Sequence, residues 1–193
     1  MASEYPDTQV DRSAIAWATR VLLQSIGEDP QREGLRGTPA RVARFWEEFI
    51  DYKDDNLDTT FTGVKADQMV VIRNIRGWSL CEHHLLPFSF TAAVGYIAEK
   101  RILGASKLVR VVQLYAHRLQ IQERLVEQIA SHVQELAGTE DVAVHMVGQH
   151  TCMQMRGVRS EDSEMITQAL RGRFLDRDKP EVRQEFMQLV HAP

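Results

Sequence analysis

The chain has 193 residues, 44% hydrophobic and 26% charged, which predicts one main domain with a substantial core. Its net charge of −4 gives no reason to expect nucleic acid as a partner. No apolar run reaches the roughly 18 residues of a membrane span. The polar start MASEYPDTQVDR lacks the basic and apolar parts of a signal peptide, so a cytoplasmic location is expected.

Two amphipathic helices are predicted in the first quarter of the chain. Apolar residues recur with helical spacing from Ile15 to Ile26. After a polar break, Thr38 is the expected N-cap of a second helix, with Pro39 at its first position and an apolar stripe as far as Ile50. We therefore expect an N-terminal helical arm over residues 1–60 and a main domain over residues 61–193.

The main domain shows two different hydrophobic periods. β-branched or alternating apolar residues predict four strands, at 69–75, 88–96, 142–147 and 152–158. Residues 77–87 are the expected loop between the first two strands, and helices are predicted at 104–138, 163–171 and 182–190. This order predicts an α+β fold, an antiparallel four-stranded sheet with long helices on one face.

The strongest chemical signal is a pair of clusters that contain both cysteines of the chain. The first is Cys81-Glu82-His83-His84, and the second is His150-Thr151-Cys152. Thiolate and imidazole are the ligands that zinc prefers. If the second cluster lies on a strand, alternation points His150 and Cys152 to the same side. The sequence therefore predicts a zinc site.

The spacing leaves the ligand set open. Either His83 or His84 could bind the ion, and four protein ligands would make a closed, structural site. Three ligands would leave a position for water, whose pKa zinc lowers from about 15.7 to about 7. Histidines beside such a site could move protons, which favours hydrolysis of a carbon–nitrogen bond.

Charged residues near the helical region indicate a second, anionic partner. Ser106, Lys107 and Arg110 stand at a predicted helix start, where backbone N–H groups favour anions, and Arg156 follows Cys152 closely. A solvated helix face explains the same residues equally well.

Gln122 and Glu123 interrupt the helical region. A carboxylate at this place could accept N–H groups from the edge of a guanine base. The alternative is an exposed polar turn.

Long segments of the chain resemble GTP cyclohydrolase I. The segments are CEHHLLPF, GASKLVRVV, RLQIQERLVEQIA and HTCMQMRGVR, with TPARVARFW before them and VRQEFMQLV after them. The resemblance extends from about residue 12 to residue 190. It implies the tunnelling fold, in which subunits pair their sheets into a barrel, and a homo-oligomer, in this family a decamer under allosteric control in some members.

The resemblance also implies residue roles. Cys81, His84 and Cys152 match the zinc ligands, and the fourth position is left for water. His83 and His150 match the proton-transfer histidines. Glu123, with Gln122 beside it, matches the guanine anchor. The residues that match the ribose and triphosphate contacts are Ser106, Lys107, Arg110 and Arg156, together with Arg41 from a neighbouring subunit.

The implied reaction is hydrolytic opening of the GTP imidazole ring at C8, with release of formate and rearrangement of the ribose. Its product is 7,8-dihydroneopterin triphosphate, a precursor of folates and pterins. The chain departs from its relatives at 89–91 (Ser-Phe-Thr), at Ala105 and at 163–167, none of which is a matched catalytic residue. The alternatives are action on another purine or pterin, and a non-catalytic structural zinc module.

Overall fold

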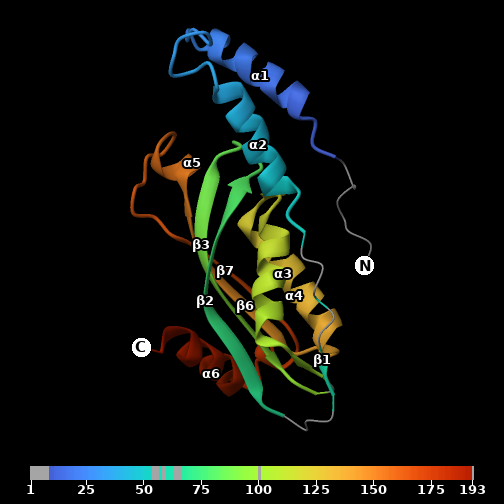
Figure 1. Cartoon of the computed structure of the whole chain (residues 1–193). Coiled ribbons are helices and arrows are strands. Elements are labelled where there is room, and N and C mark those ends of the chain that lie inside the picture. Colours follow the sequence, from blue (N-terminus) through green and yellow to red (C-terminus); the bar gives the residue numbers. More distant parts are fainter. Residues whose placement is uncertain (1–8, 54–56, 58–59, 63–66, 100, 193) are drawn as a thin grey trace. The chain divides into compact units, whose positions relative to one another are not determined.

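The computed structural model describes residues 9–53, 57, 60–62, 67–99 and 101–192 (Figure 1). The chain divides into two compact units, Met1–Lys53 and Asp54–Pro193. Among the described residues, no helix has both the length and the apolar character that crossing a bilayer requires.

The first unit is a pair of helices, α1 (Arg12–Ser25) and α2 (Thr38–Ile50). Asp11 caps α1, because its carboxylate accepts a 2.9 Å hydrogen bond from the Ala14 N–H. The predicted capping role of Thr38 is wrong. Gly37 occupies the cap position of α2, and the Thr38 hydroxyl accepts a hydrogen bond from Arg41 at 2.9 Å instead.

The second unit is built on a twisted sheet with the strand order β5-β2-β3-β6-β7. Its strands are β2 (Met69–Cys81), β3 (Pro87–Ile97), β5 (Leu119–Gln120), β6 (Val142–His150) and β7 (Met165–Leu170). The four long strands are antiparallel, as the predicted fold class requires, although β7 lies where a helix was expected. The sheet has five strands and not the predicted four, because the two-residue β5 adds a parallel edge beside the end of β2. A separate two-stranded sheet joins β1 (Thr60–Phe61) to β4 (Ile102–Leu103).

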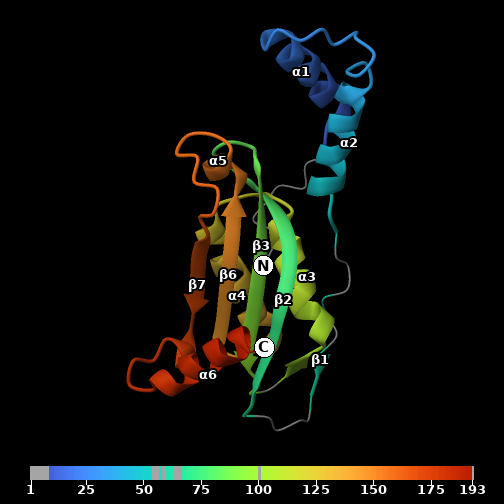
Figure 2. The same ribbon diagram turned by 90° about the vertical axis from the view of Figure 1, so that its left-hand side faces the viewer.

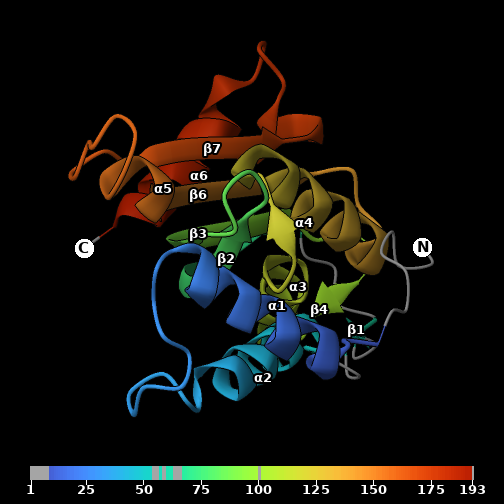
Figure 3. The same cartoon turned by 90° about the horizontal axis from the view of Figure 1, so that it is seen from above.

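Helices cover the two faces of the sheet unequally. The helices α3 (Ala105–Ala116) and α4 (Gln122–Ala137) pack on one face, against the alternate side chains Phe88, Val94 and Tyr96 of β3. The helix α6 (Pro180–His191) lies on the opposite face, where Phe186 packs with Ala93 (Figures 2 and 3). The observed class is therefore α+β, with an antiparallel sheet and its two long helices on one face.

Two predicted segments keep their type but change their extent. The expected loop at 77–87 is strand as far as Cys81, because Gly77–Leu80 pair with residues Pro87–Phe90 of β3. The helical region at 104–138 is two helices, separated where β5 pairs with β2. Gly138 ends α4 as predicted, in the left-handed conformation with φ of 64°.

Two predicted segments change type. The expected strand at 152–158 is wrong: α5 (Thr151–Gln154) is a single helical turn, and Gly157 with φ of 61° and Arg159 with φ of 50° turn the chain after it. The expected helix at 163–171 is also wrong. Its residues Met165–Leu170 form β7, since β6 offers a free edge that pairs with six consecutive residues.

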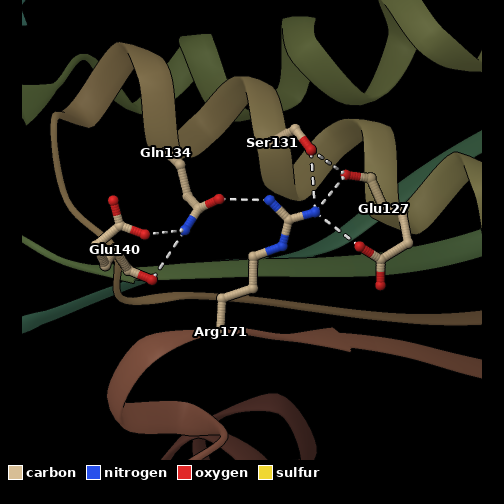
Figure 4. Close-up of polar contacts among 5 residues, drawn as sticks. All are labelled: Glu127, Ser131, Gln134, Glu140 and Arg171. Atoms are coloured by element: carbon tan, nitrogen blue, oxygen red, sulfur yellow. Dashed lines mark hydrogen bonds and ion pairs between the residues drawn. The ribbon is translucent and has the colours of Figure 1, made fainter.

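Arg171 ties β7 to α4 (Figure 4). Its guanidinium donates to the Glu127 carboxylate at 2.7 Å, to the Ser131 hydroxyl at 3.0 Å and to the Gln134 side-chain oxygen. Gln134 in turn donates to the Glu140 carbonyl at 3.0 Å. These contacts fix the middle of α4 against the edge strand, and so hold its first turn over the end of β6.

Arg171→Met keeps most of the aliphatic stem but removes the guanidinium, so the Gln134 and Ser131 oxygens lose their donor. We predict that this substitution lowers the free energy of unfolding by about 1–3 kcal/mol. Denaturant unfolding followed by circular dichroism measures the change. Arg177→Met, at an exposed position, is the matched control and should cost little. Equal effects of the two substitutions would contradict this role of Arg171.

Candidate metal centre and active site

The turn after β2 brings His84 back beside Cys81. The Cys81 carbonyl accepts hydrogen bonds from the backbone N–H of His84 at 3.3 Å and of Leu85 at 2.8 Å, and the Cys81 N–H donates to the Leu86 carbonyl at 2.9 Å. Leu85 takes φ of 56°, which lets this short turn reverse into β3. The turn therefore presents Cys81 and His84 on one side.

Cys152 reaches the same place from β6. His150, the last residue of β6, pairs with Phe88 near the start of β3, and the Thr151 hydroxyl donates to the Pro87 carbonyl at 2.6 Å. The prediction that His150 and Cys152 point together as alternate strand residues is wrong, because Cys152 lies on the helical turn α5. That turn brings its sulfur toward Cys81.

The three predicted ligand residues form one group. The two sulfurs are 3.9 Å apart, the Cys81 sulfur is 3.8 Å from His84 Nδ1, and all three donor atoms lie within 4.8 Å of one another. Two sulfurs at about 2.3 Å from a tetrahedral zinc ion would be about 3.8 Å apart. The residues present therefore fit a four-coordinate thiophilic metal. Among the described residues, no other histidine, cysteine or carboxylate joins this group.

The surroundings of the group affect its charge. Burial raises the pKa of the Cys152 thiol, as does the nearby Cys81, while Arg156 acts in the opposite direction. Arg156 also donates to His84 Nε2 at 3.0 Å. A metal on Nδ1 would leave the imidazole proton on Nε2, so that hydrogen bond cannot persist when the metal is bound. A metal bound at Nδ1 would therefore release the Arg156 guanidinium from His84.

His150 lies beside the group but does not belong to it. Its ring stacks on Phe88, with centroids 4.3 Å apart and planes 8° from parallel, and its Nε2 is 3.0 Å from the Gln122 side-chain oxygen. Burial lowers the pKa of His150, and the Glu123 carboxylate partly opposes this shift. Burial therefore favours the neutral form of the imidazole, and the Phe88 ring and the Gln122 side chain fix its orientation.

The first turn of α4 and the turn at residues 82–86 complete the surroundings of the Cys81, His84 and Cys152 group. Gln122 is buried and Glu123 is exposed at the helix start, while His83 is exposed with its ring centroid 6.3 Å from that of His84. Glu82 forms an ion pair with Arg124, which ties the turn to α4. That ion pair holds the pKa of Glu82 below its usual range.

The predicted phosphate residues at the start of α3 lie far from this group within one chain. Leu103, just before α3, donates its N–H to the Tyr96 hydroxyl at 2.8 Å, whereas His150 pairs with Phe88. Tyr96 is eight residues along β3 from Phe88, which is about 26 Å of strand. Ser106 and Lys107 in the first turn of α3, and Arg110 one turn later, are not brought together with the cysteines.

Arg41 belongs to the first unit. Its side chain is exposed, bonds to Thr38 at 2.9 Å and lies over Gly37, where a Cβ would come within 2.6 Å of Nη1. Its expected role as a phosphate contact stays a prediction.

Three residues at the site, Phe88, Arg124 and Gly148, were not predicted as site residues from the sequence. Phe88 was predicted only as a strand residue, and Arg124 only as part of a helix. Gly148 gives a readable signal, because a glycine within a β-branched strand often marks a close approach of another group. Here that group is Gln122, whose side-chain oxygen would be 2.0 Å from a Cβ at position 148.

Metal affinity should rise with pH. A metal must displace the thiol proton of Cys152, whose pKa is raised, so affinity should increase by up to about tenfold per pH unit for each thiol that is still protonated. Titration with Co²⁺, followed by sulfur-to-cobalt charge-transfer absorption at pH 6.5 and 7.5, measures this. Cys152→Ser should remove part of that absorption, and Met153→Ser should not. Affinity that does not depend on pH would contradict thiolate ligation.

Comparison with known proteins identifies the family. The family model described as GTP cyclohydrolase I matches residues 15–191. GTP cyclohydrolase 1 of Sulfurihydrogenibium sp. is 48% identical over 184 residues, covering 95% of this chain and 97% of that protein. GTP cyclohydrolase 1 of Aquifex aeolicus is 46% identical over 183 residues, covering 94% and 97%. With its Cys-His-Cys group beside a buried histidine, the chain belongs to the GTP cyclohydrolase I family.

Proposed function

We propose that the chain hydrolytically opens the imidazole ring of GTP, releases formate and rearranges the ribose to give 7,8-dihydroneopterin triphosphate, which feeds folate and pterin biosynthesis. The proposal is carried by one observation, the convergence of Cys81, His84 and Cys152 beside His150. The family match over residues 15–191 supports the substrate and the reaction.

Zinc is the proposed metal. The set of two thiols and one imidazole, with the sulfurs 3.9 Å apart, suits its ligand preference and its tetrahedral geometry. Bound at a site with an open position, zinc supplies Lewis acidity and makes hydroxide available near neutral pH. Cys81, His84 and Cys152 are the proposed ligands.

His150 and His83 are the proposed proton carriers. His150 is buried beside the cysteine group, where a neutral imidazole can take a proton from an attacking water or from the opening ring. His83 is exposed on the same turn as His84, so it can exchange protons between the site and the solvent. Two imidazoles of different exposure suit a reaction with successive proton transfers.

Glu123 is the proposed anchor for the guanine base. A carboxylate can accept two N–H groups from the amidine-like edge of guanine, and Glu123 is exposed in the first turn of α4, close enough to His150 to act on its pKa. Arg156, which metal binding frees from His84, is the proposed contact for the triphosphate.

A complete site is proposed to need more than one chain. The start of α3, with Ser106 and Lys107, stands at the other end of the sheet from the cysteines, and Arg110 follows one turn later. These residues are therefore proposed to meet GTP at the cysteine group as residues of a neighbouring subunit. Arg41 is proposed to come from a neighbour as well. This arrangement supports a homo-oligomer, which is proposed to be a decamer as in the family. Residues 61–193 are proposed to form its catalytic tunnelling-fold domain, and residues 1–60 an N-terminal arm.

Zinc-loaded protein should convert GTP to formate and a pterin that becomes fluorescent on oxidation. Removal of zinc by a chelator should abolish both products, and added Zn²⁺ should restore them. Formate release and fluorescence are measured in parallel, with ATP as the control purine. Turnover of ATP or of a pterin, but not of GTP, would favour a different substrate, and activity that survives complete zinc removal would contradict the zinc-dependent mechanism.

Glu123→Gln should raise the KM for GTP by about 5- to 150-fold, which corresponds to about 1–3 kcal/mol for a mismatched polar contact. One half of the bidentate acceptor becomes a donor in that variant. Steady-state kinetics measures the change, and Glu181→Gln on α6 is the matched control. An unchanged KM would show that Glu123 does not bind the base.

A further inference from the structure

Gln122 was expected beside the guanine base, yet its side chain is turned into the protein. The residue is 1% exposed. Its side-chain nitrogen donates to the Met165 carbonyl at 2.8 Å, to the Met146 carbonyl at 3.3 Å and to the Thr167 hydroxyl at 3.0 Å. These three acceptors from β6 and β7 use both amide hydrogens, so no donor remains for a ligand.

The same contacts fix which way the amide faces. The Met146 and Met165 carbonyls can only accept hydrogen bonds, so they require the NH₂ group and reject the flipped amide. The Gln122 carbonyl oxygen must therefore face His150 Nε2, from which it is 3.0 Å away. Because that oxygen can only accept, Nε2 carries the proton. Nδ1 of the neutral ring is then the basic nitrogen.

Two further features hold this arrangement. The Phe88 ring, fully buried, stacks on the imidazole and prevents it from tilting. Gly148 provides the space for the amide, since a Cβ there would lie 2.0 Å from the Gln122 oxygen and 2.9 Å from its side-chain carbonyl carbon. A side chain at position 148 would therefore break the contact with His150 without altering either partner.

We infer that Gln122 is a positioning residue that locks His150 in the Nε2–H tautomer, and that the Gln122 side chain does not contact the base. Gly148, which has no side chain, leaves the space that the Gln122 amide occupies. This inference rests on the proposed function only for the catalytic use of Nδ1. The tautomer itself follows from the contacts within the chain.

The tautomer can be observed directly in protein labelled with ¹⁵N at histidine. Long-range ¹H–¹⁵N spectra of the full chain at pH 7.5 should show His150 with a protonated Nε2, assigned by the loss of its signals in His150→Ala. Gln122→Met, which keeps the length but not the amide, should give a mixture of tautomers. A wild-type His150 with a protonated Nδ1 overturns the inference, whatever the protein does to GTP.

Kinetics separates positioning from base binding. Gln122→Met should lower kcat for GTP at least about tenfold with KM changed less than about twofold, since general acid–base catalysis supplies about 10²–10⁴-fold. Gly148→Ala should act in the same way, and Gln149→Met, on the exposed neighbour of His150, should be neutral. Combined with His150→Ala, Gln122→Met should cause no further loss.

The outcomes keep the two claims apart. A raised KM with unchanged kcat, or an additive double variant, overturns the positioning role, with metal content and circular dichroism confirming that each variant is folded. If the wild-type chain does not turn over GTP, the proposed function fails, and the spectra still decide the tautomer.

Discussion

The 3.9 Å separation of the Cys81 and Cys152 sulfurs depends on the register of three strands. These residues are 71 positions apart in the chain. They meet because Leu80 pairs with Pro87, and Phe88 pairs with His150, at the same end of the sheet. A slip of one residue in either ladder would turn the side chains at that end to the opposite face and separate the donor atoms. The buried core of β3, α3 and α4 holds that register.

The same end of the sheet collects the other groups that the proposed chemistry uses. The start of α4 presents Glu123 outward and Gln122 inward, so one helical turn serves the ligand and the imidazole in different ways. Arg171 fastens α4 to β7, and the Glu82–Arg124 pair fastens the 82–86 turn to α4. Residues that are not among the proposed metal ligands thus help to set the precision of the centre.

One chain carries only part of the proposed GTP site. The start of α3, with Ser106 and Lys107, is held at the far end of the sheet by the contact between Leu103 and Tyr96. Lys107 is 3% exposed. The alternative explanation of this residue, a helix face turned to solvent, would require a more exposed side chain. A site completed by a neighbour would couple catalysis to assembly, because dilution to single chains would separate the phosphate contacts from the metal centre.

The sequence predicts the chemistry of the centre better than its local structure. Both cysteines meet a histidine of the first cluster, as expected, because thiols and imidazoles at such spacings have few other uses in a chain with two cysteines. The spacing left His83 and His84 as alternatives, and only the family resemblance pointed to His84. The apolar periods also predicted α1, β3 and α6. The strand β7 was missed because Met165–Leu170 has no decisive period, and its type is set by the β6 edge. The tertiary partners of His150, Phe88 and Gln122, cannot be read from local patterns, since the β3–β6 register and the packing of α4 create them.

The most direct test of the metal centre is zinc K-edge X-ray absorption on the zinc-loaded wild type and on His150→Ala. An open centre with three protein ligands predicts two sulfur neighbours at about 2.3 Å and two nitrogen or oxygen neighbours at about 2.0–2.1 Å. The spectrum should be the same in the variant, and the second light neighbour should exchange with added anions. A first shell without sulfur, or loss of a nitrogen neighbour in His150→Ala, would contradict the three-ligand centre.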